Sequence, residues 1–199
     1  MRTASFLFAM SLGITLTFGC SKAPSTDQPA VGSSPNMRMT HLVSLQLGEQ
    51  PGAFQVEDVT GPAAGESLCY RCKYGSRPTV VIFAREVNPS VANLVQQIDQ
   101  KVSENEEKKL AAFMVALNED PEEIKPQLID VQTSHHIRHI PLTVFNDLHG
   151  PAGYGLSPEA TVQVMMWNRE GIRVNEILDG EISDDQIAKV VHQTESILK

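Results

Sequence analysis

Apolar and polar residues follow two different spacings along most of the chain. Three apolar runs, residues 79–84 (TVVIFA), 110–117 (LAAFMVAL) and 142–145 (LTVF), have the length and composition of buried strands. Between them, residues 88–102 and 121–129 carry an apolar side chain every three or four positions, which is typical of amphipathic helices. Strands that alternate with crossover helices predict an α/β fold with parallel strands.

The segments on either side of this centre have the alternating pattern of half-buried strands. Residues 54–59 (FQVEDV) predict one strand, which ends in a turn at Thr60-Gly61-Pro62. Residues 161–168 and 172–178 predict a hairpin, and Ser183 marks the start of a last amphipathic helix. We therefore expect one folded domain over residues 39–199.

The order strand, helix, strand, helix, strand, loop, hairpin, helix resembles the thioredoxin-like fold, and more closely its peroxiredoxin and membrane-tethered thiol-disulfide branches. The resemblance covers about residues 54–198. Residues 54–68 (FQVEDVTGPAAGESL) are similar to the entry hairpin, 78–86 (PTVVIFARE) to the central strand and 161–174 (TVQVMMWNREGIRV) to the final hairpin. The resemblance implies a three-layer α/β sandwich, in which a mixed sheet combines parallel strands with a C-terminal antiparallel hairpin and helix.

The first residues have the composition of an export signal. Arg2 precedes an apolar stretch of roughly 15 residues, shorter than the ~20 that a membrane-spanning helix needs. We interpret residues 1–19 as a signal peptide. The pair Gly19-Cys20 resembles the end of a bacterial lipoprotein signal, in which the cysteine becomes lipidated, although Leu16 lies one place early for that pattern. A plain secretory signal with an incidental Cys20 is the alternative.

Residues 20–38 are rich in Ser, Pro and Ala and have no apolar period, which predicts a flexible tether. Together these segments predict an exported domain, lipid-anchored to a membrane at the periplasmic or cell-envelope face. The formal charge of −8 and the scattered Lys and Arg residues argue against a nucleic-acid partner.

Cys69 and Cys72 form the only Cys-X-X-Cys of the chain, and they lie before the predicted central strand. In redox members of the family, the attacking cysteine follows that strand, at the start of a helix that lowers its pKa. Here residues 85–90 (REVNPS) contain no thiol, and Ser90 reads as a helix N-terminal residue. The place of the family's cis-proline is taken by Ala160. The usual active site is therefore predicted to be absent.

Three interpretations of the cysteine pair remain open. In the first, Cys69 and Cys72 are a displaced redox couple that exchanges disulfides with an unknown protein partner. Arg71 and Lys73 would favour the thiolate, and the neighbouring tyrosines, 70 and 74, would offer a platform for that partner. In the second, the pair is a structural disulfide closing a short ring, worth about 2 kcal/mol, in a binding module that has lost the chemistry.

The third interpretation is a metal site. Cys-X-X-Cys is half of a zinc site, and His135 and His139 precede the third parallel strand, with His136 between them. Parallel strands beginning at Pro78 and Pro141 would place both segments at one edge of the sheet. Zinc held by Cys69, Cys72, His135 and His139 is thus an alternative to redox chemistry, which itself requires no cofactor.

Overall fold

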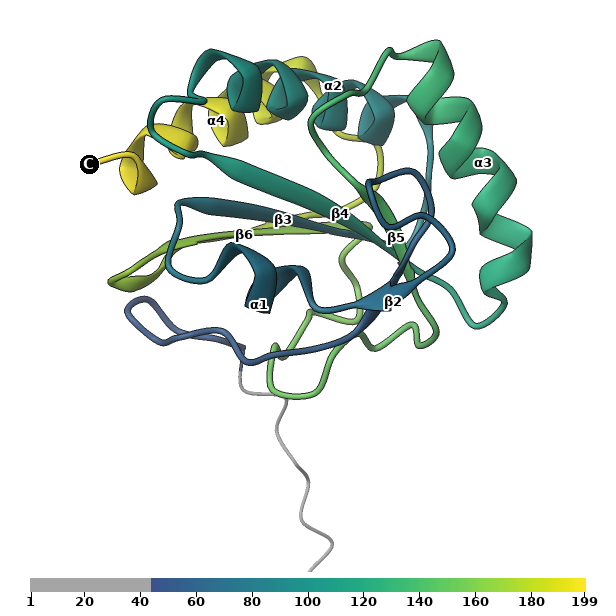
Figure 1. Cartoon of the computed structure of the whole chain (residues 1–199), viewed down its shortest axis with the longest axis horizontal. Coiled ribbons are helices and arrows are strands. Elements are labelled where there is room, and N and C mark those ends of the chain that lie inside the picture. The colour runs from purple at the N-terminus through teal and green to yellow at the C-terminus, as the bar shows by residue number, and fades with distance from the viewer. Residues whose placement is uncertain (1–43) are drawn as a thin grey trace, which may run out of the picture. The chain divides into compact units, whose positions relative to one another are not determined.

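The computed structural model describes residues 44–199 (Figure 1). The predicted signal peptide (1–19), the predicted lipidation site Cys20 and the rest of the tether lie outside the described residues. No helix in the described part is long and apolar enough to cross a lipid bilayer.

The fold is built on one seven-stranded sheet with the order β2-β1-β5-β4-β3-β6-β7. Its strands are β1 (Val56–Asp58), β2 (Ser67–Leu68), β3 (Thr79–Ala84), β4 (Ala111–Leu117), β5 (Leu142–Phe145), β6 (Val162–Asn168) and β7 (Gly171–Leu178). The helices are α1 (Tyr70–Tyr74), α2 (Pro89–Glu104), α3 (Pro121–Ser134) and α4 (Asp184–Gln193), followed by a 3₁₀ turn, η1 (Thr194–Ile197).

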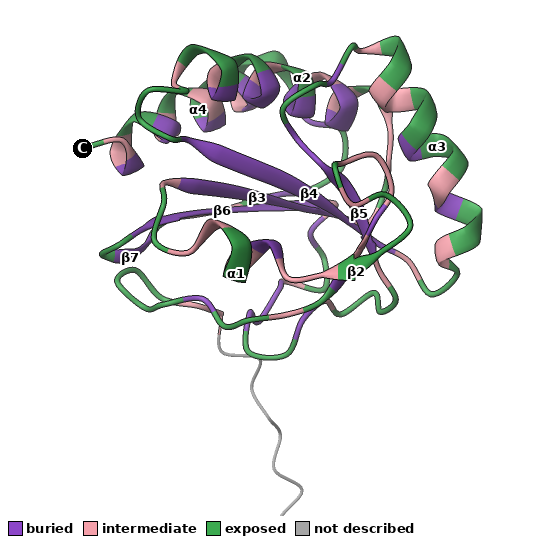
Figure 2. Cartoon of the chain, viewed as in Figure 1, coloured by how far each residue is buried: buried purple, intermediate pink, exposed green. Residues whose placement is uncertain are grey.

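The three apolar runs form the parallel centre of the sheet. Strand β3 pairs with β4 and β4 pairs with β5, so that Val81 lies opposite Phe113 and Val115 opposite Thr143. The connections run through α2 and α3, as parallel neighbours require. All residues of β3 and β4 are buried (Figure 2), because both faces of the sheet are covered. The predicted strands and crossovers are confirmed.

Antiparallel hairpins complete the sheet at both edges. Strand β6 pairs with β3 and with β7, and a bulge between Met166 and Trp167 interrupts the second pairing. At the other edge, β1 pairs with β5 and with β2. Both predicted hairpins are therefore present, and the sheet is mixed as expected.

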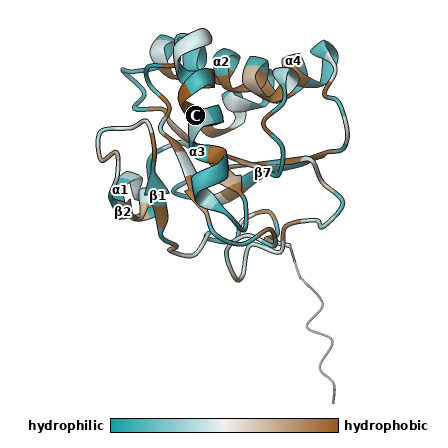
Figure 3. Cartoon of the chain, turned by 90° about the vertical axis from the view of Figure 1, so that its right-hand side faces the viewer, coloured by the Kyte–Doolittle hydropathy of each residue, from teal (hydrophilic) through white to brown (hydrophobic). Residues whose placement is uncertain are grey.

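Helices α2, α3 and α4 cover one face of the sheet, and their apolar sides pack on β3, β4, β5 and β6. The hydrophobic residues follow the strands and the sheet-facing sides of these helices (Figure 3). The other face is covered by α1 and by irregular segments, which contribute Phe54, Tyr70, Tyr154 and Leu156 to a second core. The third layer is thus mostly irregular, with one short helix.

Asp58 fixes the connection between the entry hairpin and α1. Its side chain is fully buried and accepts hydrogen bonds from the backbone N–H groups of Gly61 and Ala63 and from the hydroxyl of Tyr70, at 2.7, 2.8 and 2.7 Å. Gly61 packs so closely that an added Cβ would lie 2.6 Å from a carboxylate oxygen of Asp58. A buried carboxylate needs such donors, because burying it without partners is costly.

Tyr70 is the contact through which Asp58 positions α1. Its ring stacks on Phe113 of β4 with the ring centroids 5.5 Å apart. Burial, together with the hydrogen bond to Asp58, raises the pKa of Tyr70, so the phenol remains a donor to the carboxylate.

We expect Tyr70→Phe to lower the free energy of unfolding by about 1–3 kcal/mol, because it removes one of the two donors to a buried carboxylate oxygen of Asp58. Urea denaturation of the oxidised protein measures this. Tyr74→Phe is the matched control on the same helix, since its hydroxyl lies 3.5 Å from the carbonyl of Ala112, at the limit of a hydrogen bond. Equal losses in the two variants would contradict a special role for Asp58.

Candidate functional site

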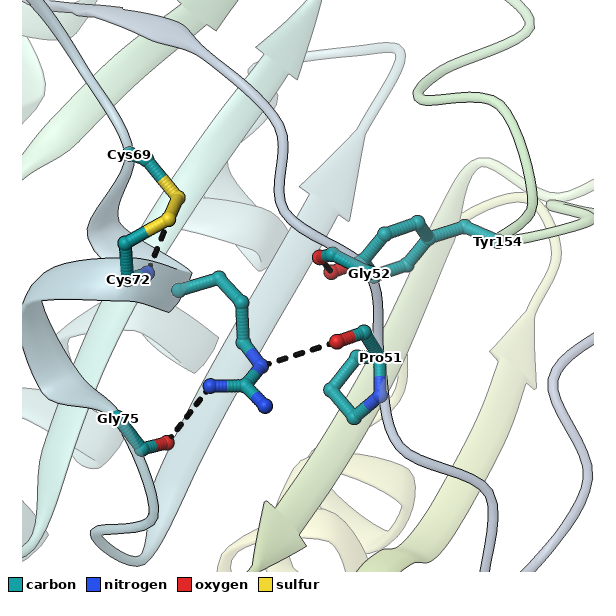
Figure 4. The surroundings of a disulfide bond; sticks show 7 residues. Pro51, Gly52, Cys69, Cys72, Gly75 and Tyr154 are labelled. Carbon is teal, nitrogen blue, oxygen red and sulfur yellow. Dashed lines mark hydrogen bonds between the residues drawn. A yellow bond between two sulfur atoms is a disulfide. The ribbon is translucent and has the colours of Figure 1, made fainter.

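Cys69 and Cys72 are joined by a disulfide with an S–S distance of 2.07 Å and a Cα–Cα distance of 5.2 Å (Figure 4). The bond spans one helical turn, because Cys69 is the N-cap of α1 and Cys72 is its third residue. In this oxidised state neither cysteine presents a thiolate, so the pair is an electrophile toward an incoming thiol.

The position of the pair corrects one part of the sequence prediction. The sequence analysis assigned no helix to the segment that holds Cys69 and Cys72, whereas α1 begins directly after Cys69. The backbone N–H of Cys72 donates to the sulfur of Cys69 at 3.0 Å. A five-residue helix has only a small dipole, so this single hydrogen bond, rather than the helix as a whole, distinguishes the two sulfurs.

The two cysteines also differ in accessibility. Cys72 is exposed, whereas Cys69 is half-buried between β2 and α1. The less accessible residue is therefore the one whose sulfur accepts a hydrogen bond. Disulfide exchange depends both on which sulfur can be reached and on how stable the leaving thiolate is, and both factors here favour attack on Cys72.

The cations beside the cysteines are held by other groups. The guanidinium of Arg71 donates to the carbonyl oxygens of Pro51 and Gly75, at 3.0 and 2.9 Å (Figure 4), and lies 6.0 Å from the centre of the Trp167 ring. The Lys73 ammonium lies 5.3 Å from the centre of the Tyr70 ring. Arg71 thus anchors α1 to the segment before β1, a role that the sequence did not indicate.

The neighbouring tyrosines do not form the exposed platform that the sequence suggested. Tyr70 is 1% exposed and belongs to the second core, and Tyr74 is half-buried against Phe113. Burial also raises the pKa of Tyr74. The accessible part of α1 therefore consists of Cys72 and Lys73.

The place where the family carries its attacking cysteine is filled by structural contacts. Asn88 caps α2 by accepting from the N–H of Val91, and the Ser90 hydroxyl donates to the Asn88 side chain at 2.8 Å. Ser90 is thus a helix N-terminal residue, as predicted. Residues 85–90 hold no thiol, and the described residues contain no cis peptide bond, so Ala160 does not recreate the family's proline.

Arg85 links the end of β3, the corner where the family carries its attacking cysteine, to the loop before β6. Its guanidinium donates to the carbonyl of Ala160 at 2.6 Å and to that of Leu148 at 3.1 Å, and its backbone N–H donates to Thr161 at 3.0 Å. Burial lowers the pKa of Arg85. The side chain thus ties the end of β3 to the loop that precedes β6, where a substrate would approach in the usual arrangement.

The four predicted zinc ligands are not brought together as a metal site. Helix α3 ends at Ser134 with His135 as its C-cap, so His135 and His139 do not share a helical face. The His139 ring is hydrogen-bonded to Asp99 at 3.0 Å, and Cys69 and Cys72 are bonded to each other. Among residues 44–199, no group of three or more His, Cys, Asp or Glu side chains is placed to hold a metal ion.

Asp99 explains why the histidine segment is ordered in this way. Its buried carboxylate accepts from the backbone N–H groups of Arg138, His139 and Ile140, at 3.1, 2.7 and 3.0 Å. No sequence pattern singled out Asp99, because it looks like one more charge on an amphipathic helix. The same is true of Arg85, whereas Asp58, three residues before a Gly-Pro turn, had the spacing of a side chain that caps that turn.

No protein-family model matches the chain, and no curated protein sequence matches it either. Solved structures do match. One is a provisionally assigned thiol:disulfide interchange protein DsbE from Chlorobium tepidum, with 13% identity, a TM-score of 0.60 and coverage of 78% of this chain and 100% of that one. A second is a secreted Mycobacterium tuberculosis disulfide oxidoreductase, with 8% identity, a TM-score of 0.52 and coverage of 72% and 95%.

A peroxiredoxin 6 from Arenicola marina is also similar, with 10% identity, a TM-score of 0.52 and coverage of 75% of this chain and 73% of that one. Similarity at these identities establishes the fold. The chain therefore has the thioredoxin-like fold that its pattern of elements predicted.

We expect Arg85→Met to destabilise the protein by about 1–3 kcal/mol without changing the reduction potential of the Cys69–Cys72 pair. The substitution keeps the apolar stem but leaves two carbonyl oxygens without their donor. Urea denaturation gives the first quantity, and equilibration with glutathione gives the second. A marked shift of the potential would show that this corner takes part in the redox site.

Proposed function

We propose that the protein exchanges disulfides with a protein partner through Cys69 and Cys72, as a thiol-disulfide oxidoreductase whose cysteine pair is displaced from the usual corner. The observation that carries this proposal is the asymmetric disulfide, with an exposed Cys72 and a half-buried, hydrogen-bonded Cys69. The thioredoxin-like fold, shared with the disulfide oxidoreductases named above, supports it.

The first step is attack by a partner thiolate on the sulfur of Cys72. The S–S bond breaks and its electron pair leaves with Cys69, whose thiolate is stabilised by the N–H of Cys72. A second partner thiolate then attacks the partner's own sulfur in the mixed disulfide and expels the Cys72 thiolate. The partner is oxidised to a disulfide, and its two protons end on Cys69 and Cys72.

The reverse sequence reduces a partner disulfide. The Cys72 thiolate attacks, and Cys69 resolves the mixed disulfide by attacking the Cys72 sulfur and releasing the partner thiol. The direction is set by the reduction potential of the pair relative to that of the partner. In either direction the exposed residue holds the partner, and the half-buried one closes the cycle.

We further propose that this domain is exported and attached to a membrane through a lipid on Cys20. The signal-like residues 1–19 and the Ser- and Pro-rich segment that follows support this proposal. An exported location also suits the chemistry, because disulfides persist outside the reducing cytosol. Globomycin, which inhibits the lipoprotein signal peptidase, tests the anchor: we expect it to block maturation of the wild-type precursor, and Cys20→Ser to abolish lipid labelling.

The reduction potential of residues 39–199, titrated against glutathione and followed by thiol alkylation, separates redox chemistry from a structural bridge. We expect a potential above about −300 mV, because an exposed disulfide closing a short ring is readily reduced. A potential well below that value would identify a structural bridge, and would favour a binding module that keeps the fold without the chemistry.

Mapping the mixed disulfide tests the separate roles of the two cysteines. Oxidised protein is treated briefly with limiting glutathione, quenched with acid, alkylated and digested with trypsin, which cuts after Arg71 and so separates Cys69 from Cys72. We expect glutathione on Cys72 in about tenfold excess, because the accessible sulfur is attacked and the stabilised thiolate leaves. Recovery mainly on Cys69 would reverse the assigned roles.

A further inference from the structure

A groove of about 460 Å³ lies beside the cysteine helix, where α1 ends and β4 and β5 begin. We define it as the cationic groove, lined by Pro62, Lys73, Tyr74, Arg77, Val102, Glu106, Leu110, Ala111, Arg138, His139 and Pro141. Its inner wall is apolar, because Leu110 and Ala111 are buried at the start of β4 and Val102 is buried at the end of α2. Its charged residues are exposed.

The charge of this groove is opposite to that of the chain. Lys73, Arg77 and Arg138 contribute three permanent cations against the single carboxylate of Glu106, whereas the whole chain has a formal charge of −8. Within the described part of the chain, none of these three cations forms a salt bridge with a carboxylate. An acidic protein thus keeps a small surface of unneutralised positive charge beside its disulfide.

Two of these cations are held in place by aromatic rings. The Arg77 guanidinium lies 5.4 Å from the centre of the Tyr74 ring, and its Nε donates to the carbonyl of Lys109 at 2.9 Å. The Lys73 ammonium lies 5.3 Å from the centre of the Tyr70 ring. Such contacts orient the side chains without neutralising them, so the positive charge remains available to a ligand.

We infer that the cationic groove binds an acidic segment that flanks the reacting cysteine of a protein partner. This inference rests on the proposed function and adds the chemical class of the partner. Lys73 directly follows the exposed Cys72, and consecutive Cα atoms are about 3.8 Å apart. A partner sulfur bonded to Cys72 is therefore attached one residue away from the groove lining, so that residues flanking the partner cysteine come within reach of the groove.

Charge complementarity of this kind acts mainly on the rate of encounter. Opposite charges steer a partner toward the site, and the effect weakens as salt screens it. The apolar wall of the groove accommodates the backbone and aliphatic parts of an extended segment. Because the chain as a whole carries a formal charge of −8, the positive charge of the groove contrasts with the net charge of the protein and favours approach of an acidic partner from this side.

The test uses three peptides that differ only beside one cysteine, which is followed by three Asp, three Ser or three Lys residues. Each peptide carries 5-thio-2-nitrobenzoate on its cysteine through a disulfide. The Cys72 thiolate of the reduced protein attacks the peptide sulfur and releases the nitrobenzoate thiolate, whose absorbance gives the rate. We expect the Asp peptide to react about tenfold faster than the Ser peptide at low salt, and the Lys peptide to react most slowly.

The variants leave Lys73 in place, because changing it would alter the chemistry of the adjacent Cys72. Arg77→Gln with Arg138→Gln should reduce the Asp-to-Ser rate ratio to near one. Arg138→Gln alone, which removes no hydrogen bond made by the arginine side chain within the described residues, should lower the ratio partly. The charge-matched control, Arg173→Gln with Lys189→Gln on β7 and α4, should keep the wild-type ratio.

A binding measurement separates this inference from the redox proposal. An Asp peptide with Ser in place of cysteine is titrated into the oxidised protein by calorimetry, and we expect binding that is lost in the Arg77, Arg138 double variant and at 1 M salt, where the screening length is about 3 Å. If no peptide reacts, the redox proposal fails. The titration still shows whether the groove binds an acidic peptide. Equal rates for all three peptides, or no binding of the Asp peptide, would contradict the inference that the groove binds an acidic segment.

Discussion

The buried carboxylate of Asp58 is the interaction on which the cysteine site depends. It gathers two backbone N–H groups of the 60–65 turn and the hydroxyl of Tyr70, and Tyr70 follows Cys69 directly. The turn, the short strand β2 and the first residue of α1 are thereby fixed to β1. A carboxylate buried without a paired cation is stable only when several donors surround it, so the loss of one donor affects the whole connection.

This constraint explains how a disulfide can occupy a helix of only five residues. An isolated helix of that length is not stable in water. Here Tyr70 and Tyr74 pack against Phe113, and Arg71 ties the helix to the carbonyl of Pro51. Because Tyr70, Arg71 and Tyr74 make these contacts, Cys72 and Lys73 are left on the outer side, so the same packing that stabilises α1 also selects the residues a partner can reach.

The usual reactive corner of the fold and the cysteine pair belong to opposite layers of the molecule. The corner at the end of β3 leads into α2 and is closed by Arg85, whereas α1 covers the other face of the sheet. One scaffold can therefore lose one site and present thiols at another, because the sheet supports surface helices on both faces. The cysteine side also differs in charge, because Lys73, Arg77 and Arg138 line the groove beside α1 and form no salt bridge within the described residues.

The sequence by itself determined the sheet. The runs at 79–84 and 110–117 are apolar on both faces, and the intervening helices have one apolar side, so the parallel strands and their crossover helices followed from burial, and the C-terminal hairpin from its alternating pattern. The absence of a thiol at residues 85–90 was also readable directly. These features depend only on which residues follow one another along the chain, so they can be read from the sequence without knowing which distant segments meet.

Only the tertiary structure decided the site. The α1 helix was not foreseen because its five residues are too few for a periodic signal, and its stability comes from Asp58 and Phe113, far from it in sequence. Arg71 was expected to favour a thiolate, and Arg85 and Asp99 gave no signal in the sequence, because the partners of all three are backbone carbonyl or N–H groups. Backbone groups are the same at every residue, so no sequence pattern identifies which of them a charged side chain will meet.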